Sequence, residues 1–381
     1  MELSDIFREF GAEYIQKFGD KIPQNHLKAI RDILACRTPQ MGGQTYYCEE
    51  CEEYHYSYHS CKNRHCPKCQ HEAGQEWLEN QMDLILPVNY FLVTFTIPGE
   101  LRSIVRSHQK LMYSILFKSS TGSLKKLSLD PKFIGGEIGM VGILHTWTRD
   151  LFYHPHIHFI VPGGGYDKER NVWHKANHKF LLPVKALSKI FRAKFQDEMK
   201  KKNLLYSIPK VVWKKRFVTH SEPVGKGETV IKYLAPYIYR VAISNSRIIK
   251  MEDHKVIFKY KDSNSNEWKL KTLDAMEFIR RFLQHVLPKG FQKVRYYGFL
   301  GSASRETFEK IKHILWYKRK VTTSKNKKVL SKRKPDICPK CGNRMILMDT
   351  IPRHKRAPPK LLRKTLIIYM KELNLQRLMK A

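Results

Sequence analysis

The sequence predicts an α+β protein, because two hydrophobic periodicities alternate along its 381 residues. In several long segments, apolar residues recur at the spacing of one helix face. Between these segments lie short runs of β-branched and aromatic residues bounded by proline or glycine, a pattern typical of strands. Hydrophobic residues make up 42% of the chain, which is enough to fill a core and excludes a disordered protein.

The first 36 residues predict a helical hairpin. Apolar residues follow a helical spacing from Ile6 to Phe18, and Pro23 opens a second helix with the same spacing.

The next segment, residues 46–69, is predicted to bind zinc through two Cys-x-x-Cys pairs. Four thiolates can surround a tetrahedral zinc ion and so fold a segment that has few aliphatic side chains. The expected ligands are Cys48, Cys51, Cys66 and Cys69. Cys61 and His65 are further donors that could replace one of these ligands or form a second site. A redox role is disfavoured, because neither pair has the strand and helix context of thioredoxin-like proteins.

The rest of the chain alternates predicted helices and strands. Helices are expected at residues 72–83, 100–120, 182–204 and 273–287. Strands are expected at residues 90–97, 135–147, 155–161 and 291–299, with a hairpin at 241–250 and 254–260. A glycine run at 163–165 either lets the backbone pass close to another chain or a ligand, or forms a plain turn.

Three histidines lie on the two middle strands. His156 and His158 share one strand face, because strand side chains alternate and Ile157 points the other way. A hairpin centred near residues 150–151 places His145 directly opposite His156. A single histidine is more often a surface or core residue, but three that converge predict a metal site.

A further helix is predicted after Thr229. Tyr233 and Tyr237 are four residues apart and therefore share one helix face, with Arg240 close to the same line. A pair of tyrosines at this spacing usually packs in a core, and only the histidines make a catalytic role the favoured interpretation. Pro236 is expected to bend the helix, since it removes one backbone hydrogen bond.

The charge of the chain predicts a polyanionic partner. Seventy Lys and Arg against thirty-five Asp and Glu give a net charge of +35, and nucleic acid is the first candidate. Lys318 to Lys334 contains nine basic residues and no acidic one, which indicates a linker or arm attracted to phosphate. Cys338 and Cys341 then form half of another zinc site. The missing ligands could be His354, Cys36 or Cys61, or the pair could be an empty remnant.

A membrane is the competing polyanion, but no segment approaches the roughly 18 consecutive apolar residues of a spanning helix. The N-terminus also lacks the basic start and apolar run of a signal peptide. We therefore expect a cytoplasmic, nucleoid-associated protein whose cysteines bind metal rather than form disulfides.

Together these groups fit phosphodiester cleavage by a protein nucleophile. Tyrosine can attack the phosphate, and a divalent cation held by His145, His156 and His158 can stabilise the developing charge. Mg²⁺ or Mn²⁺ is the expected ion, although three imidazoles bind Zn²⁺ more tightly. A phosphotyrosine link preserves the energy of the broken bond, so the end can be rejoined without ATP.

The sequence resembles the two-tyrosine rolling-circle transposases of bacterial insertion sequences, within the histidine-hydrophobe-histidine (HUH) endonuclease superfamily. The matching stretches, which span most of residues 25–301, are CRTPQMGG with CKNRHCPKCQ, LHTW with HPHIHFIVPGGG, YLAPYIYRVAIS, and PKGFQKVRYYGFL. The resemblance implies a central antiparallel sheet flanked by helices, a catalytic metal on His156 and His158, and Tyr233 and Tyr237 as nucleophiles. Pro236 departs from the family pattern, in which a basic residue precedes the second tyrosine.

The expected function is the nicking and rejoining of single-stranded DNA at transposon ends and target. Because the sequence shows no helicase module, a host helicase is expected to unwind the DNA. Two alternatives remain: a relaxase or replication initiator with the same chemistry, and a non-catalytic zinc-dependent DNA-binding protein. Three domains are expected: a helical and zinc-binding module at 1–80, a catalytic domain at 81–301 and a basic region at 302–381. The sequence makes no prediction of the oligomeric state.

Overall fold

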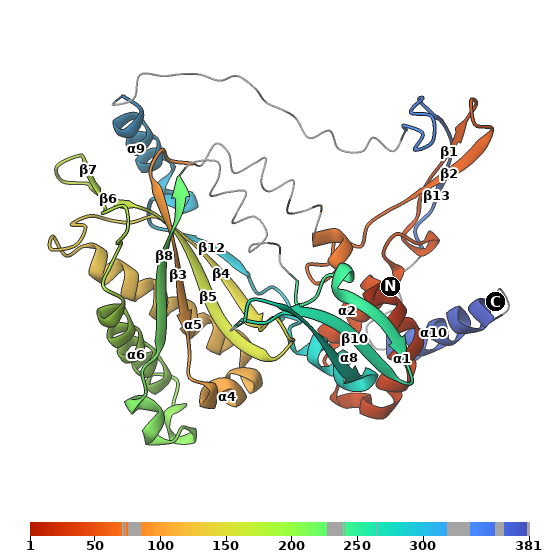
Figure 1. The fold of residues 1–381 in the computed structure, drawn as a ribbon, viewed down its shortest axis with the longest axis horizontal. Helices are drawn as coiled ribbons and strands as arrows, with labels where there is room; N and C mark the ends of the chain where they lie inside the picture. Colours follow the sequence, from red (N-terminus) through yellow and green to blue (C-terminus); the bar gives the residue numbers. More distant parts are fainter. Residues whose placement is uncertain are drawn as a thin grey trace. The chain divides into compact units, whose positions relative to one another are not determined.

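The computed structural model describes residues 1–70, 72, 74, 85–226, 239, 241–263, 265–317, 336–354 and 362–378 (Figure 1). The chain forms two compact units. The first contains Met1–Glu72, Ile243–Val286 and Thr323–Ala381, and the second contains Ala73–Ala242 and Leu287–Thr322. The expected division at residues 80 and 301 is therefore wrong, because segments from the middle and the end of the chain pack with the N-terminal helices.

The second unit is built on an antiparallel sheet in the order β12-β4-β5-β3-β8 (Figure 1). Its strands are β3 (Asn89–Thr96), β4 (Met140–Trp147), β5 (Tyr153–Pro162), β8 (Val218–Lys226) and β12 (Val294–Tyr297). The strands expected at 90–97, 135–147, 155–161 and 291–299 are confirmed, with shifted ends. The sequence pattern did not predict β8, which pairs with β3 at the edge of the sheet.

Both faces of this sheet are covered. Alternate residues of β3, such as Phe91 and Phe95, face a core shared with α4 (Arg102–Ser107), α5 (Gln109–Ser128) and α6 (Val184–Lys200). Leu92 faces the opposite side, where Phe308 and Ile311 of α9 (Arg305–Tyr317) pack. Because side chains alternate along β3, this strand contributes to both cores. The same sheet carries the three histidines.

The glycine run continues into a small hairpin of β6 (Gly164–Asp167) and β7 (Val172–Lys175). A Cβ atom on Gly164 would lie 2.4 Å from the Trp173 ring, and one on Gly165 would lie 2.6 Å from Ile134. The glycines therefore allow a close approach within this chain.

The first unit begins with the predicted helical hairpin, α1 (Leu3–Phe18) and α2 (Gln24–Ala35). Phe282 of α8 (Ala275–Gln284) contacts Phe7 of α1, with ring centroids 5.7 Å apart. Another helix, α10 (Leu362–Leu378), packs on α1 at Gly11, where a Cβ atom would lie 2.7 Å from Met370. Helices from both ends and the middle of the chain therefore share one core.

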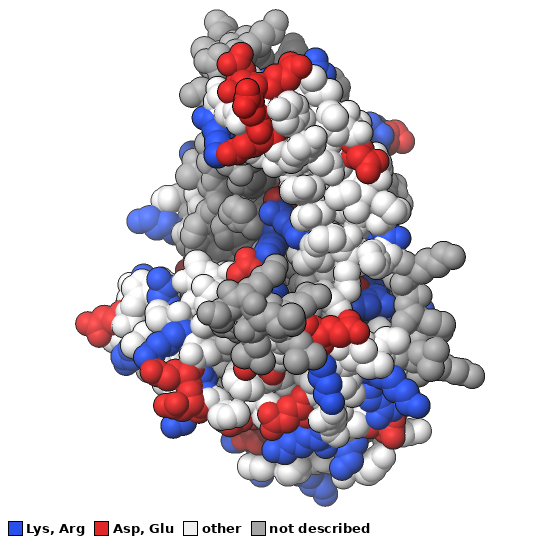
Figure 2. All heavy atoms as spheres, turned by 90° about the vertical axis from the view of Figure 1, so that its right-hand side faces the viewer, with Lys and Arg blue, Asp and Glu red and all other residues white. Residues whose placement is uncertain are grey.

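The described residues of the first unit also form two three-stranded antiparallel sheets. One contains β9 (Ile248–Glu252), β10 (Lys255–Lys261) and β11 (Trp268–Asp274), of which only the hairpin β9–β10 was expected. The other has the order β13-β1-β2, with β1 (Gly43–Cys48), β2 (Glu53–Tyr58) and β13 (Ile346–Ile351). Acidic side chains gather at the turn of the β1–β2 hairpin, at the top of Figure 2; they are Glu49, Glu50, Glu52 and Glu53.

No helix among the described residues is both long and apolar enough to cross a membrane.

Candidate catalytic and metal-binding sites

The three predicted histidines meet on the central strands of the second unit. His145 of β4 pairs directly with His156 of β5, as the hairpin predicted. One ring nitrogen from each of His145, His156 and His158 lies within 4.8 Å of the others. His145 is buried, and the other two are half-buried. Three nitrogen ligands at this spacing fit a single divalent cation with coordination positions left open for phosphate oxygens.

Two of these rings are oriented by hydrogen bonds at their Nδ1 atoms. His156 Nδ1 lies 2.6 Å from the His154 carbonyl oxygen. Because a carbonyl only accepts, Nδ1 carries the proton and Nε2 presents its lone pair. His158 Nδ1 lies 2.8 Å from Thr94 Oγ1 of β3, the residue that pairs with it across the sheet. Sequence reasoning missed Thr94, whose only signal was a hydroxyl within the apolar run of β3.

Basic and aromatic side chains surround the three histidines. Trp147 stacks on His145 with ring centroids 4.9 Å apart, and the Lys293 ammonium lies 5.3 Å from the Trp147 ring centroid. Arg102 lies 2.9 Å from His154 Nδ1. Burial, together with the Arg102 charge, lowers the pKa of His154 to about 4, so that ring is neutral near pH 7. Arg102 and Lys293 thus place positive charge beside His154 and Trp147, which suits an anionic substrate.

The predicted nucleophiles Tyr233 and Tyr237, together with Arg240 and Pro236, lie outside the described residues. Their roles stay predictions.

The eight cysteines form two groups of four, both in the first unit. One, the first cysteine cluster, is Cys36, Cys61, Cys66 and Cys69. The other, the second cysteine cluster, is Cys48, Cys51, Cys338 and Cys341. Within each cluster the sulfur atoms all lie within 4.8 Å of one another.

The predicted quartet of Cys48, Cys51, Cys66 and Cys69 is therefore wrong as a single site. Its two pairs belong to different clusters. Cys36 at the end of α2 and Cys61 complete the first cluster, whereas His65 stays outside it. Pairing of β13 with β1 brings Cys338 and Cys341 to the other pair, so neither His354, Cys36 nor Cys61 supplies their missing ligands.

The sulfur geometry fits zinc in both clusters. A tetrahedral site with Zn–S bonds of about 2.3 Å has its sulfurs about 3.8 Å apart. The Sγ–Sγ distance is 3.5 Å for Cys36–Cys69, 3.5 Å for Cys48–Cys341 and 3.9 Å for Cys51–Cys338. The neighbouring Cys341 thiol and burial raise the pKa of Cys51 to about 12. Four thiolates can therefore coexist there only when a cation offsets their mutual repulsion.

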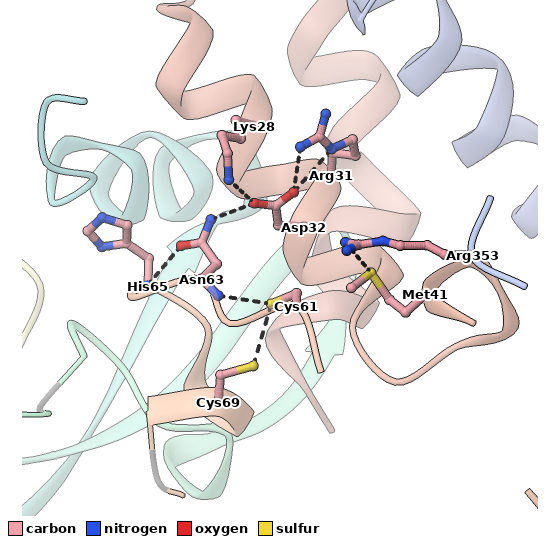
Figure 3. Close-up of polar contacts among 9 residues, drawn as sticks. All are labelled: Lys28, Arg31, Asp32, Met41, Cys61, Asn63, His65, Cys69 and Arg353. Carbon is pink, nitrogen blue, oxygen red and sulfur yellow. Dashed lines mark hydrogen bonds and ion pairs between the residues drawn. The ribbon is translucent and has the colours of Figure 1, made fainter. Parts of the chain in front are cut away.

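A polar network attaches the first cluster to α2 (Figure 3). The backbone N–H of Asn63 donates to Cys61 Sγ at 3.4 Å, and its side-chain amide donates to Asp32 at 2.9 Å. Lys28 and Arg31 also donate to Asp32. Burial alone would raise the pKa of the Asp32 carboxyl, but these three donors lower it below its ordinary value. An ionised Asp32 thus holds the loop that carries Cys61.

Comparison with known proteins identifies two matching families. Residues 139–307 match a family described as "Putative transposase", and residues 6–97 match a family described as "Transposase zinc-binding domain". The first match contains all three histidines, and the second contains the whole first cysteine cluster. Cys338 and Cys341 lie outside both.

Two relatives cover most of the chain. It is 36% identical over 325 residues to "Putative transposase y4qJ" of Sinorhizobium fredii, which covers 80% of this chain and 81% of the relative. It is 25% identical over 293 residues to "Transposase for insertion sequence element IS801" of Pseudomonas savastanoi pv. phaseolicola, which covers 72% and 70% respectively. No solved structure matches the chain significantly.

Proposed function

Because the chain belongs to the family of insertion-sequence transposases that carry an N-terminal zinc-binding domain, we propose that it is a rolling-circle DNA transposase. In this proposal it nicks and rejoins single-stranded DNA through a 5′-phosphotyrosine intermediate. The observation that carries the proposal is the convergence of His145, His156 and His158, with Nε2 of His156 directed away from its backbone hydrogen bond. A Mg²⁺ or Mn²⁺ ion on these nitrogens would polarise the scissile phosphate.

The remaining steps are assigned to residues of the chain. The phenol oxygen of Tyr233 or Tyr237 attacks the phosphorus, and the bond from phosphorus to the 3′ oxygen breaks. The released 3′ oxygen takes up a proton, and the 5′ end stays linked to the tyrosine. A 3′-hydroxyl from another strand then attacks the phosphotyrosine and regenerates the phenol. Arg240 is proposed to hold the phosphate, because its guanidinium matches two phosphate oxygens.

Two zinc ions are proposed as structural, one in each cysteine cluster. They stabilise the unit that carries the zinc-binding domain and take no part in cleavage. The proposed partners are single-stranded DNA and a host helicase that unwinds the duplex.

The test is covalent capture of labelled single-stranded DNA from a transposon end. We expect the full-length protein with Mn²⁺ to give a labelled adduct that survives denaturation. Tyr233→Phe with Tyr237→Phe should give none, since both rings remain and only the hydroxyls are lost. Tyr206→Phe is the matched control, because it removes a hydroxyl from a side chain that is 87% exposed. An adduct formed by the double variant would show that the nucleophile lies elsewhere.

Replacement of His156 or His158 by Ala should abolish the adduct and leave DNA affinity nearly unchanged, because affinity comes from dispersed Lys and Arg side chains. His178→Ala, at an exposed position, is the control. If the His156 variant still forms adduct at the normal rate, the proposed metal role of His156 is wrong. If the unmodified protein binds DNA but forms no adduct, a non-catalytic DNA-binding protein becomes the better description.

A further inference from the structure

The sheet β9–β10–β11 of the first unit has one buried face and one open face. Val256, Phe258 and Leu273 lie on the buried face. Phe258 contacts Phe278 of α8, with ring centroids 5.8 Å apart. This packing anchors the sheet, so the side chains of the open face are presented on a fixed backbone.

Two large, exposed apolar side chains of β11 lie on the open face. Trp268 is 61% exposed and Leu270 is 65% exposed, and both belong to β11. The strand register places Lys261 opposite Trp268 and Lys259 opposite Leu270. The Lys259 ammonium lies 5.6 Å from the Trp268 ring centroid. Directly paired residues share a sheet face, so the lysines of β10 line one side of the apolar pair.

The charge of the open face is positive. Lys250, Lys255, Lys259 and Lys261 lie on this face, together with the acids Glu252 and Asp274. Glu252 pairs with Lys250, and Asp274 accepts hydrogen bonds from the first turn of α8. Both acids are thus already engaged, while Lys255 is exposed and Lys259 and Lys261 are half-buried on the same face as the indole. The acidic turn of β1–β2 in the same unit has the opposite character (Figure 2).

We propose that this open face, defined by Lys255, Lys259, Lys261, Trp268 and Leu270, binds single-stranded DNA. The proposal rests on the proposed function, which requires unpaired DNA. An exposed indole on an edge strand, with the lysines of β10 along its inner side, matches an unpaired base whose backbone phosphates lie beside it. Duplex DNA keeps its bases stacked inside the helix and so offers no ring to Trp268. The occupant is therefore a single strand, held by base stacking on Trp268 and Leu270 and by phosphate contacts from β10.

The experiment measures affinity of the full-length, zinc-loaded protein for a fluorescent oligothymidylate by anisotropy. Trp268→Ala should weaken binding about tenfold, which corresponds to one lost base stack. Trp268→Phe keeps an aromatic ring and should restore most of the affinity. Lys259→Gln should lower the slope of log affinity against log salt by about 0.7.

A matched control exists in the second unit. Trp316 of α9 is 50% exposed and also has a lysine ammonium, that of Lys312, 5.9 Å from its ring centroid. Trp316 lies on a helix and has no lysine-bearing strand paired beside it. Trp316→Ala should therefore bind the oligonucleotide like the unmodified protein.

Three outcomes would overturn the proposal. One is unchanged affinity of Trp268→Ala for the single strand, and another is an equal loss for single-stranded and duplex DNA. The third is a loss of binding to anionic lipid vesicles with normal DNA binding, which would assign the face to a membrane surface. Covalent capture is measured separately. If the unmodified protein forms the adduct and Trp268→Ala binds the oligothymidylate normally, only the proposed DNA-binding face is refuted. If Trp268→Ala binds more weakly but the unmodified protein forms no adduct, only the proposed cleavage chemistry is refuted.

Discussion

Three histidines need a defined orientation before they can share an ion, and Thr94 is the residue that orients His158. Outer groups of this kind fix the tautomer and rotation of a ligand ring, and their loss typically weakens metal binding about 10- to 100-fold. The side chain of Thr94 comes from a neighbouring strand and contributes no ligand itself.

We therefore expect Thr94→Val to lower Mn²⁺ affinity about tenfold or more, with the fold intact, because valine has a similar shape and no hydroxyl. Thr94→Ser should restore most of the affinity. Titration calorimetry with Mn²⁺ measures both. Equal affinities for the valine and serine variants would mean that the hydroxyl does not orient the ring.

A second single-residue constraint lies at Gly298, between β12 and α9. Its φ of +60° is in the left-handed region, and a Cβ atom there would lie 1.9 Å from the Ile138 carbonyl oxygen. No rotation of a side chain can relieve a clash with backbone. Gly290 has a similar φ of +72°, but a Cβ atom there would meet nothing within 4 Å.

Gly298→Ala should therefore destabilise the protein by about 3 kcal/mol or more, whereas Gly290→Ala should cost only about 1–2 kcal/mol of backbone strain. Urea unfolding of the two variants separates the cost of the steric clash at Gly298 from the cost of a positive φ, which both variants share. Equal losses would show that the backbone near Ile138 moves aside.

At the scale of one element, α8 has its acidic groups at its N-terminus. Asp274 caps the helix by accepting from the backbone N–H groups of Met276 and Glu277. Hydrogen bonds from Arg280, and then from Arg281, outweigh partial burial and lower the pKa of Glu277 from 4.5 to about 2. The Glu277 carboxylate also lies in the first turn, where the helix dipole favours negative charge.

A folded-state pKa below the ordinary value contributes stability that is fully present above pH 4.5 and is lost as the pH falls towards 2. We expect Glu277→Gln to be less stable than the unmodified protein at pH 7, and this difference to shrink below pH 4.5. The urea midpoints of both proteins are compared at each pH, because acid effects that are common to the two proteins then cancel. A difference that stays constant down to pH 2 would contradict the lowered pKa.

At the scale of the whole molecule, the second cysteine cluster joins distant parts of the sequence. Cys48 and Cys51 precede Cys338 and Cys341 by most of the chain, yet Gly43–Tyr47 of β1 pairs with β13 and brings the two halves together. The buried side chains of Tyr46 and Met345 pack with the cluster. A metal ion there would close a loop of nearly three hundred residues and hold β13 in place.

We expect about two zinc ions per chain in the full-length protein, measured by elemental analysis. Cys338→Ser with Cys341→Ser should remove one, and Cys66→Ser with Cys69→Ser should remove the other. If all four of Cys48, Cys51, Cys66 and Cys69 bound one ion instead, the first double variant would keep its zinc. That result would restore the quartet expected from sequence.

Local patterns in the sequence determined the parts of the fold that local physics controls. The hairpin β4–β5 follows from alternating hydrophobicity and a short turn, so the pairing of His145 with His156 could be predicted from a stretch of about twenty residues. The helices α1 and α2 follow in the same way from a spacing of 3.6 residues. The family resemblance, carried by the same motifs, gave the zinc-binding transposase that the comparisons confirm.

Tertiary structure alone decided which cysteines share a site and which segments share a core. All eight thiols are chemically equivalent donors, so spacing identified pairs but could not say which pairs meet. The answer depended on β13 pairing with β1 and on α2 ending at Cys36. Thr94 behind His158, and the packing of α8 against α1, likewise arise from contacts between residues far apart in sequence. Such contacts leave no periodic signal in either partner, because each is fixed by packing of whole elements rather than by the residues beside it in the chain.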